Sequence, residues 1–501
     1  MLTKVKGSVW DSVDNGLAVN INDYKHLVVG DDWTVAIQAA IDGNNGKTLY
    51  VPDGTFMVSD VLNLTSTTTV SWTGTGTLKS TTTAGSGGTG VGHSILNYQG
   101  CSDFFVEGIT LDNSAISTFL SATRCLTLDS CDNYRISGTY GKTSGAFTAA
   151  TQCSNYTVYG NRITISSSDG VAHHDGVIDQ WWGSNNFTIV GNTIDGASIA
   201  RYPILVTGES TAGAASGCSN FTISSNKINN CLFTGIWVNG REGINTDFAV
   251  TGNVVDTVSD FHGISISDCV NGTVSGNTVR NTEFIGINLY EETSAGGVTG
   301  AQNISVTGNT VINANLNGSV SDATGSAIVI QGANSKNCTV VGNITGGSTH
   351  RRAIQFASGV SNCGETGNID SGATQTPVIN DTSGTNSNKI TGGTFTSTTT
   401  NVTNVTSSSV KGNYSAQGDE CTFFIEATIQ STASGACTLR FTLPLSSTFT
   451  LVDDAFGNCV DAFGNTAIIQ ADTVNNELEL QIQAGTATTY VLRGSVNYKI
   501  K

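Results

Sequence analysis

The chain has 501 residues, of which 12% are charged and 59 are glycine, and its formal net charge is −17. So acidic a chain would repel nucleic-acid phosphates, which argues against nucleic-acid binding. No apolar stretch approaches the roughly 18 residues of a membrane span, and no charged start followed by an apolar run opens the sequence. We therefore expect neither membrane insertion nor a secretory signal.

The first predicted element is a helix over residues 31–41, followed by a strand, a turn and a strand at 47–56. Acidic residues lead the helix, and a helix placed ahead of a stacked repeat covers its open first turn. Four apolar side chains share one helical face: Trp33, Ile37, Ala40 and Ile41.

A recurring segment follows, clearest in Cys153–Ile163, and it returns with drift at intervals of 24 to 34 residues. Each copy ends in a Gly-Asn or Ser-Asn pair. We interpret this pair as a turn, because Gly and Asn tolerate positive φ. A fixed element with variable inserts indicates one unit stacked on copies of itself. The asparagine of the turn stands at positions 161, 192, 226, 253, 277, 309, 343 and 368.

Three short strands fit each repeat. The first carries an aromatic residue and, two residues later on the same face, Val or Ile. The second follows the turn, and the third begins near a glycine in several copies, as in Gly263–Ile266. Strong helix formers are few, so the predicted fold class is all-β, a parallel β-helix. The aromatic position is occupied by Phe104, Tyr134, Tyr156, Phe187, Phe221 and Phe248.

Stacking places like positions above one another at the strand spacing of ~4.8 Å. We therefore expect the asparagines to form a ladder of side-chain amide bonds. Four of the 12 cysteines also share a column, where a buried thiol acts as a small apolar filler. No Cys-X-X-Cys pair suggests zinc or redox work, and we expect no metal and no cofactor. The four cysteines are Cys101, Cys131, Cys153 and Cys218.

The repeats fade into Thr- and Ser-rich sequence at 395–409. Beyond Gly412, the segments 423–430, 477–484 and 490–500 alternate in the manner of antiparallel strands. The sequence therefore predicts a small C-terminal antiparallel β domain.

Ala36–Asp42 followed by Leu49–Phe56 resembles the opening of pectate-lyase-like right-handed β-helices, which is common in bacteriophage tailspikes and polysaccharide depolymerases. With the repeats, this resemblance covers roughly residues 30–410. It implies a right-handed single-stranded parallel β-helix with an N-terminal capping helix. The implied domains are a connector at 1–30, a catalytic or binding β-helix at 31–410, and a C-terminal β-sandwich at 411–501 that trimerises or binds carbohydrate.

The resemblance also implies an activity: an endo-acting tailspike depolymerase that binds and cleaves bacterial capsule or O-antigen. Its implied partners are the surface polysaccharide, two further copies in a homotrimer, and phage tail or baseplate proteins. Such a protein is assembled in the host cytoplasm and acts outside the cell as part of the virion tail.

A β-helix hides its core, so chemistry is expected on outward-facing columns and inserted loops. Acidic residues follow the third strand in successive turns. Carboxylates one or two turns apart would be separated by about 5 or about 9–10 Å, which straddles the spacings of retaining and inverting glycosidases. The candidate catalytic residues are Asp175, Asp179, Glu209, Glu242, Asp268, Glu291 with its neighbour Glu292, and His174. The plainer alternative is a solvated acidic edge.

His, Asp and paired Trp residues also gather within Ser168–Trp182, and aromatic faces with nearby polar groups are typical of sugar sites. The alternatives are a turn with capping side chains, a metal corner at His-His-Asp, and plain salt bridges for the arginines. The candidate substrate-binding residues are Trp181, Trp182, Arg201, Trp237, Arg241, His262 and Tyr290.

Three other functions stay open at this point. A polysaccharide lyase would cleave a uronic-type sugar by β-elimination, with His174, His262 or a tyrosine as base. A non-catalytic receptor-binding spike would use the same aromatic residues without turnover, and a pectinase-like enzyme is the weakest alternative. The excess of carboxylates favours hydrolysis.

Overall fold

The computed structural model describes residues 18–81, 94–116, 123–166, 176–208, 217–241, 243–292, 299–375, 379–381, 389–390, 393–397, 399–417, 420–443, 451, 454–486 and 488–499. They divide into two compact units. The first lies within Met1–Glu283 and Glu291–Gly300, and the second within Phe284–Tyr290 and Ala301–Lys501.

The first unit opens with the 3-10 helix η1 (Ile21–Leu27) and the helix α2 (Thr34–Asp42). The predicted helix is present but begins three residues later, because Asp32 stays outside and its carboxylate accepts from the backbone N–H of Thr34 at 2.9 Å. Trp33 packs edge-on against Phe56 with ring centroids 4.8 Å apart. The helix buries the side chains of Ala36, Ile37, Ala40 and Ile41.

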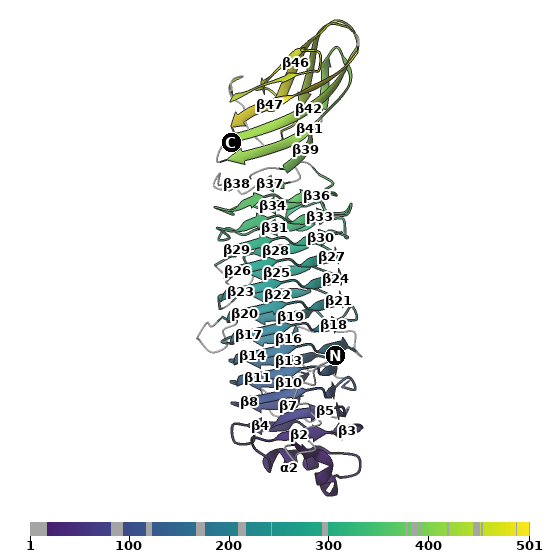
Figure 1. Cartoon of the computed structure of the whole chain (residues 1–501), viewed down its shortest axis with the longest axis vertical. Coiled ribbons are helices and arrows are strands. Elements are labelled where there is room, and N and C mark those ends of the chain that lie inside the picture. Colours follow the sequence, from purple (N-terminus) through teal and green to yellow (C-terminus); the bar gives the residue numbers. More distant parts are fainter. Residues whose placement is uncertain are drawn as a thin grey trace, which may run out of the picture. The chain divides into compact units, whose positions relative to one another are not determined.

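Three parallel sheets follow, and every turn of chain adds one strand to each of them (Figure 1). In the first unit, the first sheet contains β1 (Ala18–Asn20), β2 (Thr48–Val51), β5 (Ser71–Gly74), β8 (Ser102–Glu107), β11 (Asp132–Ser137), β14 (Ser154–Tyr159), β17 (Asn185–Val190), β20 (Ser219–Ser224), β23 (Asn245–Thr251) and β26 (Cys269–Ser275). The second sheet contains β3 (Thr55–Val58), β6 (Thr77–Ser80), β9 (Thr110–Asp112), β12 (Tyr140–Thr143), β15 (Arg162–Ile165), β18 (Thr193–Asp195), β21 (Lys227–Cys231), β24 (Val254–Val258) and β27 (Thr278–Thr282). The third sheet contains β4 (Leu62–Thr65), β7 (Ser94–Gln99), β10 (Arg124–Asp129), β13 (Ala146–Thr151), β16 (Gly176–Trp181), β19 (Tyr202–Thr207), β22 (Ile236–Asn239) and β25 (Ile264–Ser267).

The second unit repeats the same three-strand turn and contains the short helix α3 (Asp322–Gly325). Its first-sheet strands are β29 (Gln302–Thr307), β32 (Thr339–Val341), β35 (Gly364–Thr366) and β38 (Lys389–Ile390). Its second-sheet strands are β30 (Thr310–Ile312), β33 (Ile344–Gly346) and β36 (Ile369–Asp370). Its third-sheet strands are β28 (Ile287–Tyr290), β31 (Ile328–Ile330), β34 (Ile354–Phe356) and β37 (Ile379–Asp381).

A separate antiparallel sheet ends the second unit, as the alternating C-terminal segments predicted. The sheet begins before residue 411, so the predicted boundary at 410 falls within its third strand along the chain, β41 (Val405–Gln417). In sheet order its strands are β39 (Gly393–Ser397), β41 (Val405–Gln417), β42 (Glu420–Ser431), β47 (Thr489–Lys499), β44 (Ala455–Val460), β45 (Thr466–Asp472), β46 (Glu477–Ala484), β43 (Gly435–Phe441) and β40 (Thr399–Thr403).

The predicted asparagine ladder is confirmed. The side-chain oxygen of Asn226 accepts from both the backbone N–H and the side-chain amide of Asn192, at 3.0 and 2.9 Å. The amide of Asn226 in turn donates to Asn253 at 2.9 Å and to the carbonyl of Ile189 at 3.0 Å. The same side-chain bonds link consecutive members in each unit: Asn161, Asn192, Asn226, Asn253 and Asn277 in the first, and Asn309, Asn343 and Asn368 in the second.

The aromatic register is confirmed as well. Consecutive rings from Phe104 to Phe248 lie face to face with centroids 4.6 to 5.5 Å apart. The next turn pairs Phe248 with Gly272, where a Cβ would lie 2.1 Å from the Phe248 ring, so the column ends at a residue without a side chain. All 12 cysteines are buried free thiols, as the sequence predicted. Within the described ranges, no helix reaches the length and apolarity needed to cross a bilayer.

The ladder should stabilise the fold measurably. Asn226→Ala removes the acceptor of two Asn192 donors and the donor to Ile189, and it leaves these groups buried. We expect a loss of about 1–3 kcal/mol in unfolding free energy, measured by chemical denaturation. Asn45→Ala, at an exposed position, is the control and should change little. Equal stability of the two variants would contradict a stabilising role for the ladder.

Candidate functional site

Successive side chains along each strand of the third sheet point alternately into the β-helix and away from it. Isoleucines at 0% exposure fill the interior of β16, β19, β22 and β25, so the residues next to them in sequence face outward. These outward residues stack in register from turn to turn: Asp179, Leu205, Trp237 and Ser265. Side chains from distant parts of the sequence therefore meet on this face.

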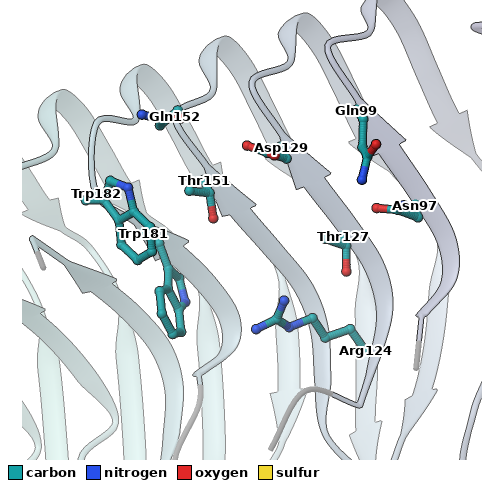
Figure 2. A pocket seen from close by; sticks show the side chains of 9 residues that line it. All are labelled: Asn97, Gln99, Arg124, Thr127, Asp129, Thr151, Gln152, Trp181 and Trp182. Carbon is teal, nitrogen blue, oxygen red and sulfur yellow. The ribbon is translucent and has the colours of Figure 1, made fainter. Parts of the chain in front are cut away.

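A hollow of about 340 Å³ lies over β7, β10, β13 and β16, and we call it the tryptophan groove (Figure 2). Trp181 and Trp182 border it with ring centroids 5.3 Å apart at a 61° angle. The Arg124 guanidinium lies 5.8 Å from the Trp181 ring centroid. The lining residues are Asn97, Gln99, Arg124, Thr127, Asp129, Thr151, Gln152, Trp181 and Trp182. Aromatic faces beside amides, hydroxyls and charged groups can hold sugar rings and their hydroxyls.

Further along the same face, four aromatic side chains and an arginine form what we call the aromatic cluster. Tyr202 lies 4.9 Å from Trp237 and 5.7 Å from Phe233, measured between ring centroids. Phe233 stacks on Phe261 at 4.3 Å, and the guanidinium of Arg201 lies 5.4 Å from the Phe233 ring centroid. Trp237 is half-buried and donates from Nε1 to Ser267 at 3.2 Å.

A carboxylate acts on this cluster electrostatically. Burial raises the pKa of the Tyr202 phenol, the positive charge of Arg201 lowers it, and the negative charge of Glu292 raises it further. Glu291 and Glu292 are both half-buried. The cluster therefore combines ring faces, a guanidinium and nearby acids on one surface.

The two other predicted acids that the structure describes are deeply placed. Asp179 faces outward in its strand but is 0% exposed, and its Oδ2 accepts from the backbone N–H of Gly176 at 3.2 Å. Asp268 is 1% exposed, and its two oxygens accept from the backbone N–H groups of Glu292 and Gly300, each at 2.9 Å. Asp268 thus ties together both ends of the 292–300 segment. The remaining candidates His174, Asp175, Glu209 and Glu242 lie outside the described residues.

The other predicted binding residues differ in accessibility. His262 is 4% exposed, contacts the Phe261 ring at 3.8 Å, and burial lowers its pKa to about 3, so it is neutral at physiological pH. Arg241 is exposed at the end of its turn. Tyr290 is half-buried at the end of β28, in the second unit. Within the described ranges, no group of three His, Cys, Asp or Glu side chains is arranged to hold a metal ion.

Several residues of this face were not predicted from the sequence, including Arg124, Tyr202, Phe233 and Phe261. A signal was available for two of them, because Phe233 and Phe261 each stand two residues before the glycine of a third strand. Arg124 carried no comparable signal, because nothing in the sequence of β10 marks it as facing the tryptophans of a later turn.

Comparison with known proteins bears on the fold. No family model matches the sequence, and no curated protein matches it. A solved structure of a double mutant of the tailspike protein of E. coli bacteriophage HK620 is similar over 98% of this chain and 95% of its own, with 14% identity and a TM-score of 0.57. PfbA, a surface adhesin of Streptococcus pneumoniae, is similar over 73% of this chain and 94% of its own, with 14% identity and a TM-score of 0.52. The chain has the parallel β-helix fold, as the sequence predicted.

The environment of Asp268 predicts an unusual pH dependence. Burial raises its pKa above 3.8, the charge of Glu291 adds to the rise, and the backbone donors of the 292–300 segment oppose it. The folded state therefore binds the proton more tightly than the unfolded state does. As pH rises from 3.8 through the folded pKa, the unfolding free energy of the wild type should fall relative to that of Asp268→Asn.

Chemical denaturation of both proteins at a series of pH values across this window checks the sign. Asp53→Asn, at an exposed turn, serves as the control carboxylate variant. A wild type that instead gains stability over Asp268→Asn with rising pH would show that the backbone donors outweigh burial.

Proposed function

We propose that the protein is a tailspike-type depolymerase, which binds a bacterial surface polysaccharide on the outer face of the third sheet and cleaves it within the chain. The observation that carries this proposal is the tryptophan groove, where two tryptophans, amides, hydroxyls, an arginine and the carboxyl group of Asp129 line one outward hollow. The aromatic cluster extends the same kind of surface over later turns. The similarity to a phage tailspike supports the fold on which such a surface is built.

The reaction we propose is glycoside hydrolysis by two carboxyl groups. One donates its proton to the glycosidic oxygen as the bond to the anomeric carbon breaks. The other either attacks that carbon or removes a proton from the attacking water. Glu291 and Glu292 are the described acids best placed for this work, because they are half-buried and Glu292 acts electrostatically on the aromatic cluster.

We assign Asp268 a positioning role, since its two oxygens already accept bonds from the backbone that carries Glu292. The buried Asp179 and the acids Asp175, Glu209 and Glu242 stay candidates for the second carboxylate. Tyr202 is a poor candidate for the base of a β-elimination, because burial raises the pKa of its phenol and keeps it protonated. No cofactor takes part in this proposal.

Incubation with purified capsular and O-antigen polysaccharides tests the proposal, with chain length followed by size-exclusion chromatography. Glu291→Gln and Glu292→Gln should each lower the cleavage rate by about 10² or more if they are acid–base residues, while binding persists. Trp181→Ala should weaken binding itself, because it removes a wall of the groove.

Glu477→Gln, in the C-terminal sheet, is the matched control and should keep full activity. Binding without any shortening would instead identify a non-catalytic receptor-binding spike. Products that absorb in the near ultraviolet would identify a lyase.

We also propose a homotrimer that attaches to phage tail or baseplate proteins in the virion. Assembly would precede release from the host cytoplasm. Light scattering on the purified chain should give three times its mass, and a monomer would reject this part of the proposal.

A further inference from the structure

The strongest feature that the proposed function leaves unexplained is the placement of arginines on the third sheet. The chain has 22 Lys and Arg residues against 39 Asp and Glu. Yet Arg124 lines the tryptophan groove, and Arg201 lies against the aromatic cluster. Both side chains are half-buried.

The two arginines share a geometry. Each guanidinium lies over an aromatic ring, at 5.8 Å from the Trp181 centroid for Arg124 and 5.4 Å from the Phe233 centroid for Arg201. The negative face of an aromatic ring attracts a guanidinium, which presents its N–H groups as a planar fork. A planar fork held in this way matches the two oxygens of a carboxylate. The hydroxyl groups of a neutral sugar also accept from a guanidinium, but these bonds lack the charge assistance of a bond to a carboxylate.

The arginines also lie on one edge of one sheet. Arg124 pairs in register with Ala146 of β13, and Gly176 of β16 pairs with Tyr202, the residue after Arg201. Three strand steps therefore separate the two positions, or ~14 Å at ~4.8 Å per step. From Arg124 the register runs through Ala146 and Gly176 to Tyr202, so Arg201 stands one residue before this column.

Building on the proposed function, we infer that the polysaccharide bound on this face is anionic, with carboxylate-bearing sugars held by Arg124 and Arg201. The tryptophans and the aromatic cluster hold the sugar rings, and the two guanidinium groups select the charged ones. Local cations are needed for this, because a net charge of −17 repels an anionic chain at long range. At about 0.1 M salt that repulsion is screened beyond ~10 Å, whereas a half-buried pair at the surface is screened less.

The test uses a panel of purified acidic and neutral bacterial polysaccharides, with affinities measured by isothermal titration calorimetry. Each acidic polymer that binds is compared with its own carboxyl-reduced form, in which the acid becomes a neutral alcohol. We expect only acidic polymers to bind, and carboxyl reduction to weaken binding about tenfold or more. Arg124→Gln and Arg201→Gln should each weaken binding of the native polymer, with little effect on the reduced form.

Arg135→Gln is the matched control, because the Arg135 guanidinium also lies over a ring, 5.7 Å from that of Phe105, but on the first sheet. It should bind as the wild type does. Equal affinity for native and reduced polymer, or binding and cleavage of a neutral polymer, would overturn the inference and leave the proposed function standing. Tight binding of an acidic polymer without cleavage would support the inference and reject hydrolysis. If no polymer binds, both fail together.

Discussion

Register between successive turns is the constraint on which the rest of the structure depends. From Asn192 to Asn277, each ladder asparagine accepts from a backbone N–H and a side-chain amide of the turn before it, and its own amide donates to the carbonyl of an earlier strand. A slip of one residue would break these buried bonds and turn inward-facing side chains outward. The asparagines therefore keep like positions in columns while the inserts between strands vary in length. The ladder therefore also keeps the outward-facing residues of the third sheet, which form the candidate site, aligned from turn to turn.

How much the sequence could predict follows from the same constraint. The repeat predicted the three sheets, the ladder, the aromatic column and the buried cysteines, because each depends on residues at a fixed offset within a turn. The helix was predicted three residues early, because the sequence did not show that Asp32 would lie outside the helix and accept from the backbone N–H of Thr34. Arg124 was missed because its partner Trp181 belongs to another turn.

The acids show why composition alone is a weak guide to a catalytic site. Asp179 and Asp268 follow the predicted pattern, yet both carboxylates are buried and accept hydrogen bonds from the backbone. A carboxylate in that position organises the backbone around it. Offset from a glycine cannot separate this role from direct chemistry, because both require an acid at the same end of the strand.

The buried cysteines have a practical consequence. The twelve thiols are spread from Cys101 in the early turns to Cys459 in the C-terminal sheet, and all are buried. A thiol reagent added from solution can modify a buried thiol only when the surrounding strands open. Mass spectrometry of the labelled sites would therefore report local unfolding around each cysteine. It would show which turns of the β-helix unfold first.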